Sequence, residues 1–246
     1  MFDFAKLGEN LAKNTVFVME FMGIIVALFV IAFLLELVER KKSGSKERTF
    51  ATRKVTAIGV LSAMSSILML FELPLFFAPN FYKLDFSEIP ILIGAFAYGP
   101  AAGVVMEFIK ILLKLVMKGT STAFVGELAN FAVGCSFIIP AASIYMFKKT
   151  KKMAVVSCVI GTLILTVFGT TFNAIYLLPA FSKLFHMDMD AILAMGEKVN
   201  PLMKSGSITS FVIVCVAPLN FLKGLFVSVV TILIYKPLSR FLKGTK

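Results

Sequence analysis

Seven mostly apolar stretches recur along this chain, and most of them are long enough to cross a lipid bilayer. Crossing the hydrocarbon takes a helix of about 20 apolar residues. A backbone inside lipid must satisfy its own hydrogen bonds, and runs of this length do so as helices. The sequence therefore predicts an all-α integral membrane protein. The stretches are residues 15–38, 55–77, 89–98, 101–117, 124–147, 153–178 and 208–235.

The third stretch is too short to cross a membrane alone. Residues 89–98 are followed by Gly99-Pro100, a pair that interrupts helices, so we predict two helices here, the first short or tilted. Prolines at positions 74 and 79 end the second stretch and open a loop, residues 77–88. Hydrophobic residues make up 59% of the chain, and no polar segment is long enough to form a separate soluble core.

The basic residues indicate the orientation. The formal net charge is +11, and 15 of the 25 Lys and Arg residues fall in segments 40–54, 148–152 and 236–246. Loops rich in Lys and Arg stay in the cytoplasm, which explains the charge without a nucleic-acid partner. The loops 77–88, 118–123 and 180–207 are then external, and the carboxyl terminus is cytoplasmic. We expect residues 1–52 to form an amino-terminal transmembrane helix with a basic cytoplasmic linker, and residues 53–246 the main membrane domain.

Lys223 is the only charged residue in the stretch 208–235. An ammonium at the centre of a membrane helix costs roughly 2.5–3.5 kcal/mol, so this side chain should face a cavity or a partner. Asn220 lies about one helical turn earlier, between Pro218 and Gly224, where the helix can loosen. Together these groups indicate a binding site. Asn173 on the preceding stretch either joins them or forms a helix-to-helix hydrogen bond.

Further polar groups allow two interpretations each. Glu107, Lys110, Lys114 and Lys118 project from one face of a helix, either as internal ion pairs or as a cationic wall beside a pocket. Glu127 and Asn130 share the face of the next helix. The Glu127 carboxylate needs a partner, which a lysine of that stripe would supply, while the hydroxyl-rich turn before it is equally explained by capping.

Small residues and one external segment complete the candidates. Gly59 and Ala63 lie four residues apart and permit close backbone contact, within the bundle or with another subunit. In the segment 180–207, an aspartate of the pair Asp188 and Asp190 could cap a short interfacial helix. We favour this over a metal site formed by the two, because no third ligand is near in sequence.

Catalytic and nucleotide-binding patterns are absent from the sequence. The chain has one histidine, His186, and contains neither H-E-x-x-H nor G-x-x-x-x-G-K-[ST]. We therefore predict no enzymatic activity, no catalytic residues, no metal and no cofactor. Active transport by this chain would need an energy source on another protein.

Five segments, taken together, resemble one family of membrane proteins from about Arg53 to the carboxyl terminus. The chain resembles the substrate-binding (S) subunits of energy-coupling factor (ECF) transporters, and most closely the riboflavin-specific family. The segments are Asp85-Phe86-Ser87-Glu88-Ile89-Pro90, Gly99-Pro100-Ala101-Ala102-Gly103, Lys118-Gly119-Thr120-Ser121-Thr122, Gly126-Glu127-Leu128-Ala129-Asn130-Phe131 and Pro218-Leu219-Asn220-Phe221-Leu222-Lys223-Gly224.

The resemblance implies a core of six transmembrane helices in a bacterial cell membrane, which makes the helix at residues 15–38 an addition. It implies capture of riboflavin from outside and delivery inward with a transmembrane scaffold protein and two ABC-type ATPases. The residues that it implicates are Asn173, Asn220, Lys223, Glu127 and Asn130 for the ligand, Pro79 and Asp85 in a lid loop, and Gly59 and Ala63 for the scaffold.

Several alternatives remain open. FMN is a candidate second ligand, with the stripe from Lys110 to Lys118 as a source of cations for its phosphate. The chain could instead serve another vitamin, or act alone as a secondary carrier coupled to an ion through Glu107 or Glu127. A membrane scaffold without a ligand is the remaining possibility.

Overall fold

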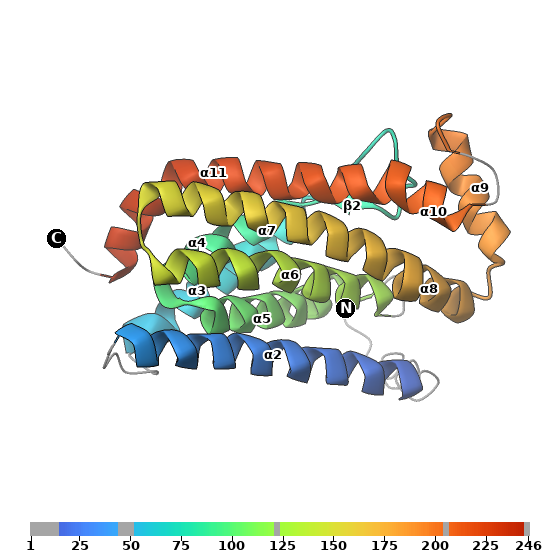
Figure 1. Cartoon of the computed structure of the whole chain (residues 1–246). Coiled ribbons are helices and arrows are strands. Elements are labelled where there is room, and N and C mark those ends of the chain that lie inside the picture. Colours follow the sequence, from blue (N-terminus) through green and yellow to red (C-terminus); the bar gives the residue numbers. More distant parts are fainter. Residues whose placement is uncertain (1–14, 44–51, 121–123, 204–206, 244–246) are drawn as a thin grey trace.

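The computed structural model describes residues 15–43, 52–120, 124–203 and 207–243. In this part of the chain, long helices lie side by side in one bundle (Figure 1), which confirms the prediction of an all-α membrane protein. Four continuous helical segments are long and apolar enough to cross a membrane: Met19–Glu39, Val125–Phe147, Lys151–Lys183 and Ile208–Leu238.

The first half of the bundle consists of α2 (Thr15–Ser43), α3 (Thr52–Met69), α4 (Glu88–Tyr98), α5 (Pro100–Lys118) and α6 (Val125–Phe147). Two short strands, β1 (Leu73–Pro74) and β2 (Lys83–Leu84), pair antiparallel in the loop between α3 and α4, with Leu73 opposite Leu84. The second half consists of α7 (Lys151–Phe172), η1 (Asn173–Leu177), α8 (Leu178–Phe185), α9 (Met189–Val199), α10 (Ile208–Phe211), η2 (Val212–Val216) and α11 (Ala217–Lys243).

The second predicted span is shorter than the sequence suggests. It was expected to reach residue 77, but α3 ends at Met69 because Pro74 and the residue before it favour an extended backbone, which here forms β1. Helix α4 has 11 residues, a length of about 16 Å, against a hydrocarbon thickness of about 30 Å. The count of six core spans plus one therefore remains a prediction.

Two π-helical turns interrupt the last two long helices, and a proline explains each. Turn η1 is followed two residues later by Pro179, and η2 by Pro218. Proline has no N–H to donate to the preceding helical turn, so the backbone widens there. The loosening expected between Pro218 and Gly224 thus lies before Pro218, whereas Gly224 packs tightly against Thr162 of α7.

The core lies between α4, α5, α6, α7 and α11. Small residues let the helices approach: a Cβ atom at Gly103 would come within 2.5 Å of Ile138 on α6. Rings of Phe96, Tyr145 and Tyr235 pack together between α4, α6 and α11.

The loops divide between the two ends of the bundle. The β1–β2 loop and α9 lie at one end, and the α6–α7 turn and the last turns of α11 lie at the other (Figure 1). This grouping matches the predicted alternation of loops. Helix α2 lies along α5 and α6. Most of the predicted basic linker, residues 44–51, lies outside the described residues, so the division at residue 52 stays a prediction.

Candidate ligand-binding site

A pocket opens at the end of the bundle that carries the β1–β2 loop and α9. It contains about 840 Å³ of unfilled space when the open solvent at its mouth is included. Helix α6 and the turns η1 and η2 with their following helices form its walls. The lining residues are Phe81, Tyr82, Lys83, Val125, Gly126, Ala129, Asn130, Val133, Asn173, Leu177, Leu178, Phe181, Val216, Leu219, Asn220 and Lys223.

The pocket brings together four of the five residues predicted to contact a ligand. Asn130, Asn173, Asn220 and Lys223 line it, although they come from three different long helices. Glu127 does not belong to the lining. Its carboxylate instead contacts the Lys114 ammonium and accepts a hydrogen bond of 3.0 Å from the Thr120 hydroxyl. Glu127 therefore supports the α5–α6 turn, and a direct contact with a ligand is not what this arrangement provides.

Lys223 faces both the pocket and two carboxylates. Its Nζ atom lies 3.0 Å from Asp85 Oδ2 and 2.9 Å from Glu88 Oε1. Asp85 belongs to the segment 70–87 between α3 and α4, and Glu88 begins α4. This segment contains nearly all of the lid predicted at residues 77–88, and we call it the lid loop. One ammonium thus joins the lid, α4 and α11 at the floor of the pocket.

The ion pairs continue into the core through Lys110, which is fully buried. Its Nζ atom lies 2.5 Å from Glu107 Oε2 and 3.3 Å from Glu88 Oε1, and it donates to the Ser87 hydroxyl at 3.1 Å. Glu88 therefore bridges Lys110 and Lys223. We call Asp85, Glu88, Glu107, Lys110 and Lys223 the buried charge cluster; it pairs three carboxylates with two ammonium groups.

Asp85, the member of this cluster that belongs to the lid loop, is ionised. Burial by itself would raise the pKa of the Asp85 carboxyl, but Lys223, Lys110 and the hydrogen bonds from Ser87 lower the pKa to about 2. Asp85 is thus an anion throughout the physiological pH range, and its pair with Lys223 persists there.

The charged stripe on α5 forms ion pairs, as one of the two interpretations predicted. Lys110 and Lys114 pair with the buried carboxylates of Glu107 and Glu127, while Lys118 reaches Glu72 at 2.8 Å near the exposed end. None of these lysines is in the pocket lining, so the interpretation as a cationic wall is wrong. The stripe from Lys110 to Lys118 therefore supplies no cation to the pocket for an FMN phosphate.

Asn173 and Asn220, which lie near the two π-helical turns, differ in their hydrogen bonds. Asn173 Oδ1 accepts a hydrogen bond of 2.7 Å from the Tyr82 hydroxyl, and its Nδ2 donates to Gly169 O at 2.7 Å. Asn220 Nδ2 is buried and has no hydrogen-bond partner in the described part of the chain. A buried donor without a partner is costly, so Asn220 offers an N–H group to a ligand. Gly169 makes room for it, since a Cβ atom there would lie 2.5 Å from Asn220 Nδ2.

The lid loop lines the pocket with aromatic residues that the sequence did not single out. The Phe81 ring stacks on Phe181 of α8 at 5.4 Å, and Tyr82 contacts both Asn173 and the Phe211 ring. In the sequence, the one sign of this role is that Phe81 and Tyr82 are aromatic residues within a loop. Pro79 does not line the pocket; its carbonyl accepts a hydrogen bond from Tyr82 N at 2.8 Å and so shapes the turn that presents Tyr82.

Helix α9 lies at the loop end of the bundle, and Asn200, the residue after it, donates to Phe77 O of the lid loop at 3.2 Å. A short helix capped by an aspartate was predicted in this segment. Asp188 does occupy the N-cap position, but its side chain makes no capping hydrogen bond, so that detail was wrong.

Gly59 and Ala63 lie on the outer face of α3. Both are exposed, and nothing lies within 4 Å of the Cβ position at Gly59. Large apolar residues beside them, including Val60 and Met64, are also exposed. This face is therefore not packed inside the bundle, one of the two possibilities that the spacing left open.

Comparisons with known proteins identify the family. The model of the family "ECF transporter, substrate-specific component" matches residues 53–235. The riboflavin transporter RibU of Staphylococcus aureus is 32% identical over 78% of this chain and 93% of its own length. The riboflavin transporter FmnP of Bacillus subtilis is 30% identical over 74% of this chain and 90% of its own length.

A solved structure of the S component of a bacterial ECF transporter has a similar fold. Its TM-score is 0.60 at 30% sequence identity, and the match covers 78% of this chain and 98% of that one. The matched region includes α3 to α11 up to Tyr235, and with them every residue of the pocket described above. The chain is therefore a multi-pass membrane protein of a transporter family and not an enzyme: it belongs to the substrate-specific components of ECF transporters.

Proposed function

We propose that this chain binds riboflavin from outside the cell and delivers it inward as the S component of an ATP-driven ECF transporter. The observation that carries the proposal is that the Lys223 ammonium and Asn220, whose Nδ2 has no hydrogen-bond partner among the described residues, line one mostly apolar pocket. The names of the relatives, which are riboflavin transporters, indicate the same ligand.

The chemistry of the isoalloxazine ring suits these groups. Its pyrimidine edge alternates hydrogen-bond acceptors and a donor, which asparagine amides match, and a cation stabilises electron density at N1 and O2. The apolar ring faces would lie against Val133, Leu177 and Leu219, with Tyr82 of the lid above. Asn130 lines the same pocket and adds a further amide. Its Nδ2 donates to Gly126 O at 3.3 Å, which leaves its carbonyl oxygen as the acceptor.

A purified sample tests ligand binding directly. The isolated chain should bind riboflavin and should not accumulate it in proteoliposomes, with or without ATP, because it lacks a nucleotide-binding motif. Concentrative uptake should appear when a scaffold protein and two ATPases are added. Absorbance of the purified protein and uptake of labelled riboflavin are the measurements. A preparation that ignores added flavin would refute the ligand, and proton-driven accumulation by the chain alone would favour a secondary carrier.

The outer face of α3 is the proposed contact with the scaffold protein. Replacing Gly59 or Ala63 by Leu should reduce uptake by the assembled transporter severalfold, because close helix contact needs small residues, while riboflavin affinity of the isolated chain stays unchanged. Val167→Leu, on the exposed face of α7, is a matched control that should alter neither quantity. Equal loss of uptake and binding would show that these positions act inside the S component.

The proposed orientation puts the lid end outside and the carboxyl terminus in the cytoplasm, following the basic clusters. The three native cysteines are buried, so single introduced cysteines can report on each end. Lys198→Cys on α9 should react with an impermeant thiol reagent in intact cells, and Lys149→Cys in the α6–α7 turn should be protected. The reverse pattern would place the pocket on the cytoplasmic side.

A further inference from the structure

Helix α2 lies outside the part of the chain that matches the family, yet it packs along the core. The family match begins at residue 53, whereas α2 ends at Ser43. The helix contacts α5 and α6, and its buried residues Ile25 and Ala32 join a core cluster with Val104 and Ile139. Phe29 adds an edge-on contact with the Phe108 ring at 5.9 Å. One face of the helix therefore packs against the core, while most of its other residues are exposed.

The outer half of α2 packs directly behind the pocket wall. Phe21, Ile24 and Leu28 belong to an apolar cluster that also contains Val125, Ala129, Leu177 and Phe181. These last four residues also line the pocket. The cluster therefore connects α2 to the pocket wall, so a shift of the helix would be transmitted to the pocket lining.

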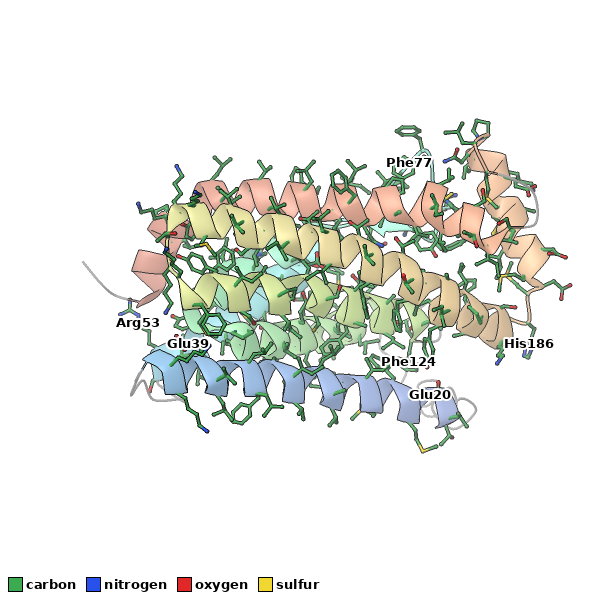
Figure 2. All side chains as sticks on the ribbon, viewed as in Figure 1. Glu20, Glu39, Arg53, Phe77, Phe124 and His186 are labelled. Carbon is green, nitrogen blue, oxygen red and sulfur yellow. The ribbon has the colours of Figure 1, made fainter. Side chains whose placement is uncertain are left out.

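A hydrogen bond joins α2 to the π-helical turn that carries Asn173. The hydroxyl of Tyr176 in η1 donates to the Glu20 carboxylate, across 156 residues of sequence. Within the same turn, Asn173 and Leu177 line the pocket, while Tyr176 is absent from the lining. Figure 2 shows Glu20 near the pocket end of α2, with Glu39 at the opposite end.

Turn η1 depends on support from outside itself. It is a single π-helical turn, and Pro179 leaves it without one helical hydrogen bond. The Tyr176 ring is held by Phe172 on one side, at 5.4 Å, and by Glu20 at its hydroxyl. The position of Asn173 is thus coupled to α2 through a backbone turn of low intrinsic stability.

We propose that α2 is part of the ligand-binding apparatus: through Glu20 and its apolar face it fixes turn η1, with Tyr176 as a positioning residue for Asn173. The inference rests on the proposed flavin binding. It assigns a role in binding to a helix outside the region shared with the family. The ligand affinity then depends on α2, although α2 does not contact the ligand.

Flavin affinity of the full chain, measured by fluorescence quenching in lipid nanodiscs, tests the hydrogen bond. Tyr176→Phe and Glu20→Ala should each weaken binding by about three- to tenfold, and the double variant should bind no more weakly than either single variant. Glu20→Gln keeps a carbonyl acceptor and should stay near the parent. Glu39→Ala, at the other end of the same helix, is the control and should have no effect. Parental affinity in all variants would overturn the proposal.

The apolar contact has its own matched pair. Leu28 packs behind the pocket wall, whereas Leu34 of the same helix is exposed on the outer face. Leu28→Ala should weaken flavin binding, and Leu34→Ala should leave it unchanged. An equal effect of the two would show that α2 acts only through general membrane anchoring.

Hydrogen exchange of the ligand-free protein separates this inference from the flavin proposal. Amides of residues 173–181 should exchange faster in Tyr176→Phe and Glu20→Ala than in the parent or Glu39→Ala. A parent that binds no flavin refutes the proposed ligand, but the exchange result still decides whether α2 fixes η1. Unchanged exchange in this segment overturns the inference, even if affinity falls.

Discussion

Lys223→Met should lower riboflavin affinity at least tenfold and also destabilise the ligand-free protein. A lost hydrogen bond to a buried ligand atom costs about 1–3 kcal/mol, which corresponds to roughly tenfold or more in affinity. In the free protein the substitution leaves Asp85 without its ammonium partner, and breaking a buried ion pair from one side costs about 3–5 kcal/mol. Titration with riboflavin and thermal unfolding in detergent measure the two effects.

This expectation reverses the one that the sequence alone supports. A lone lysine in an apolar helix should cost more than it returns, so its removal should stabilise the protein. In the structure, the Asp85 and Glu88 carboxylates pair with the Lys223 ammonium, so this charge stabilises the folded protein. The double variant Lys223→Met with Asp85→Asn removes the orphaned anion and should recover much of the stability without recovering affinity. A single variant that binds as tightly as the parent would remove Lys223 from the site.

Lys110→Met should have the largest effect on folding. Lys110 is fully buried and is the shared partner of Glu107 and Glu88, so its loss leaves Glu107 as an isolated charge in the core. The expected loss of stability is about 3–5 kcal/mol. A substantial drop in the thermal midpoint, or failure to recover folded protein from membranes, is the expected result.

Lys118→Met on the same helix is the matched control. Lys118 pairs with Glu72 at an exposed position, and surface pairs contribute less than about 1 kcal/mol. The double variant Lys110→Met with Glu107→Gln should regain part of the lost stability because no isolated charge remains at Glu107. If the Lys110 and Lys118 variants melted alike, the buried charge cluster would not be a determinant of stability.

The sequence predicted the membrane class and most helix positions because those depend on local properties. The length of each apolar run sets whether it spans, and prolines and glycines set where it ends. Runs such as residues 124–147 correspond to α6 within one residue. The second span was too long by eight residues, because an apolar run continues past Met69 while Pro74 redirects the backbone into β1.

The sequence also indicated which polar residues share the pocket, since each stood out against an apolar background. It could not show how they are paired. Lys223 and Asp85 are 138 residues apart, and only the packing of the lid loop against α11 brings them together. For Glu127 the sequence predicted a lysine of the charged stripe as partner, and the fold makes that partner Lys114. The ligand contact that the resemblance implied is absent from the pocket lining.

Hydropathy, helix breakers and charged residues within apolar stretches are properties of the sequence itself. They determined that this protein is a helical membrane protein with a polar site near its last helix. The tertiary structure alone decided which carboxylate neutralises which lysine, how Tyr82 of the lid reaches Asn173, and that α2 packs behind the pocket wall. Those contacts join distant segments, and the energy of a buried charge or hydroxyl depends on the partner within about 3 Å, which only the fold specifies.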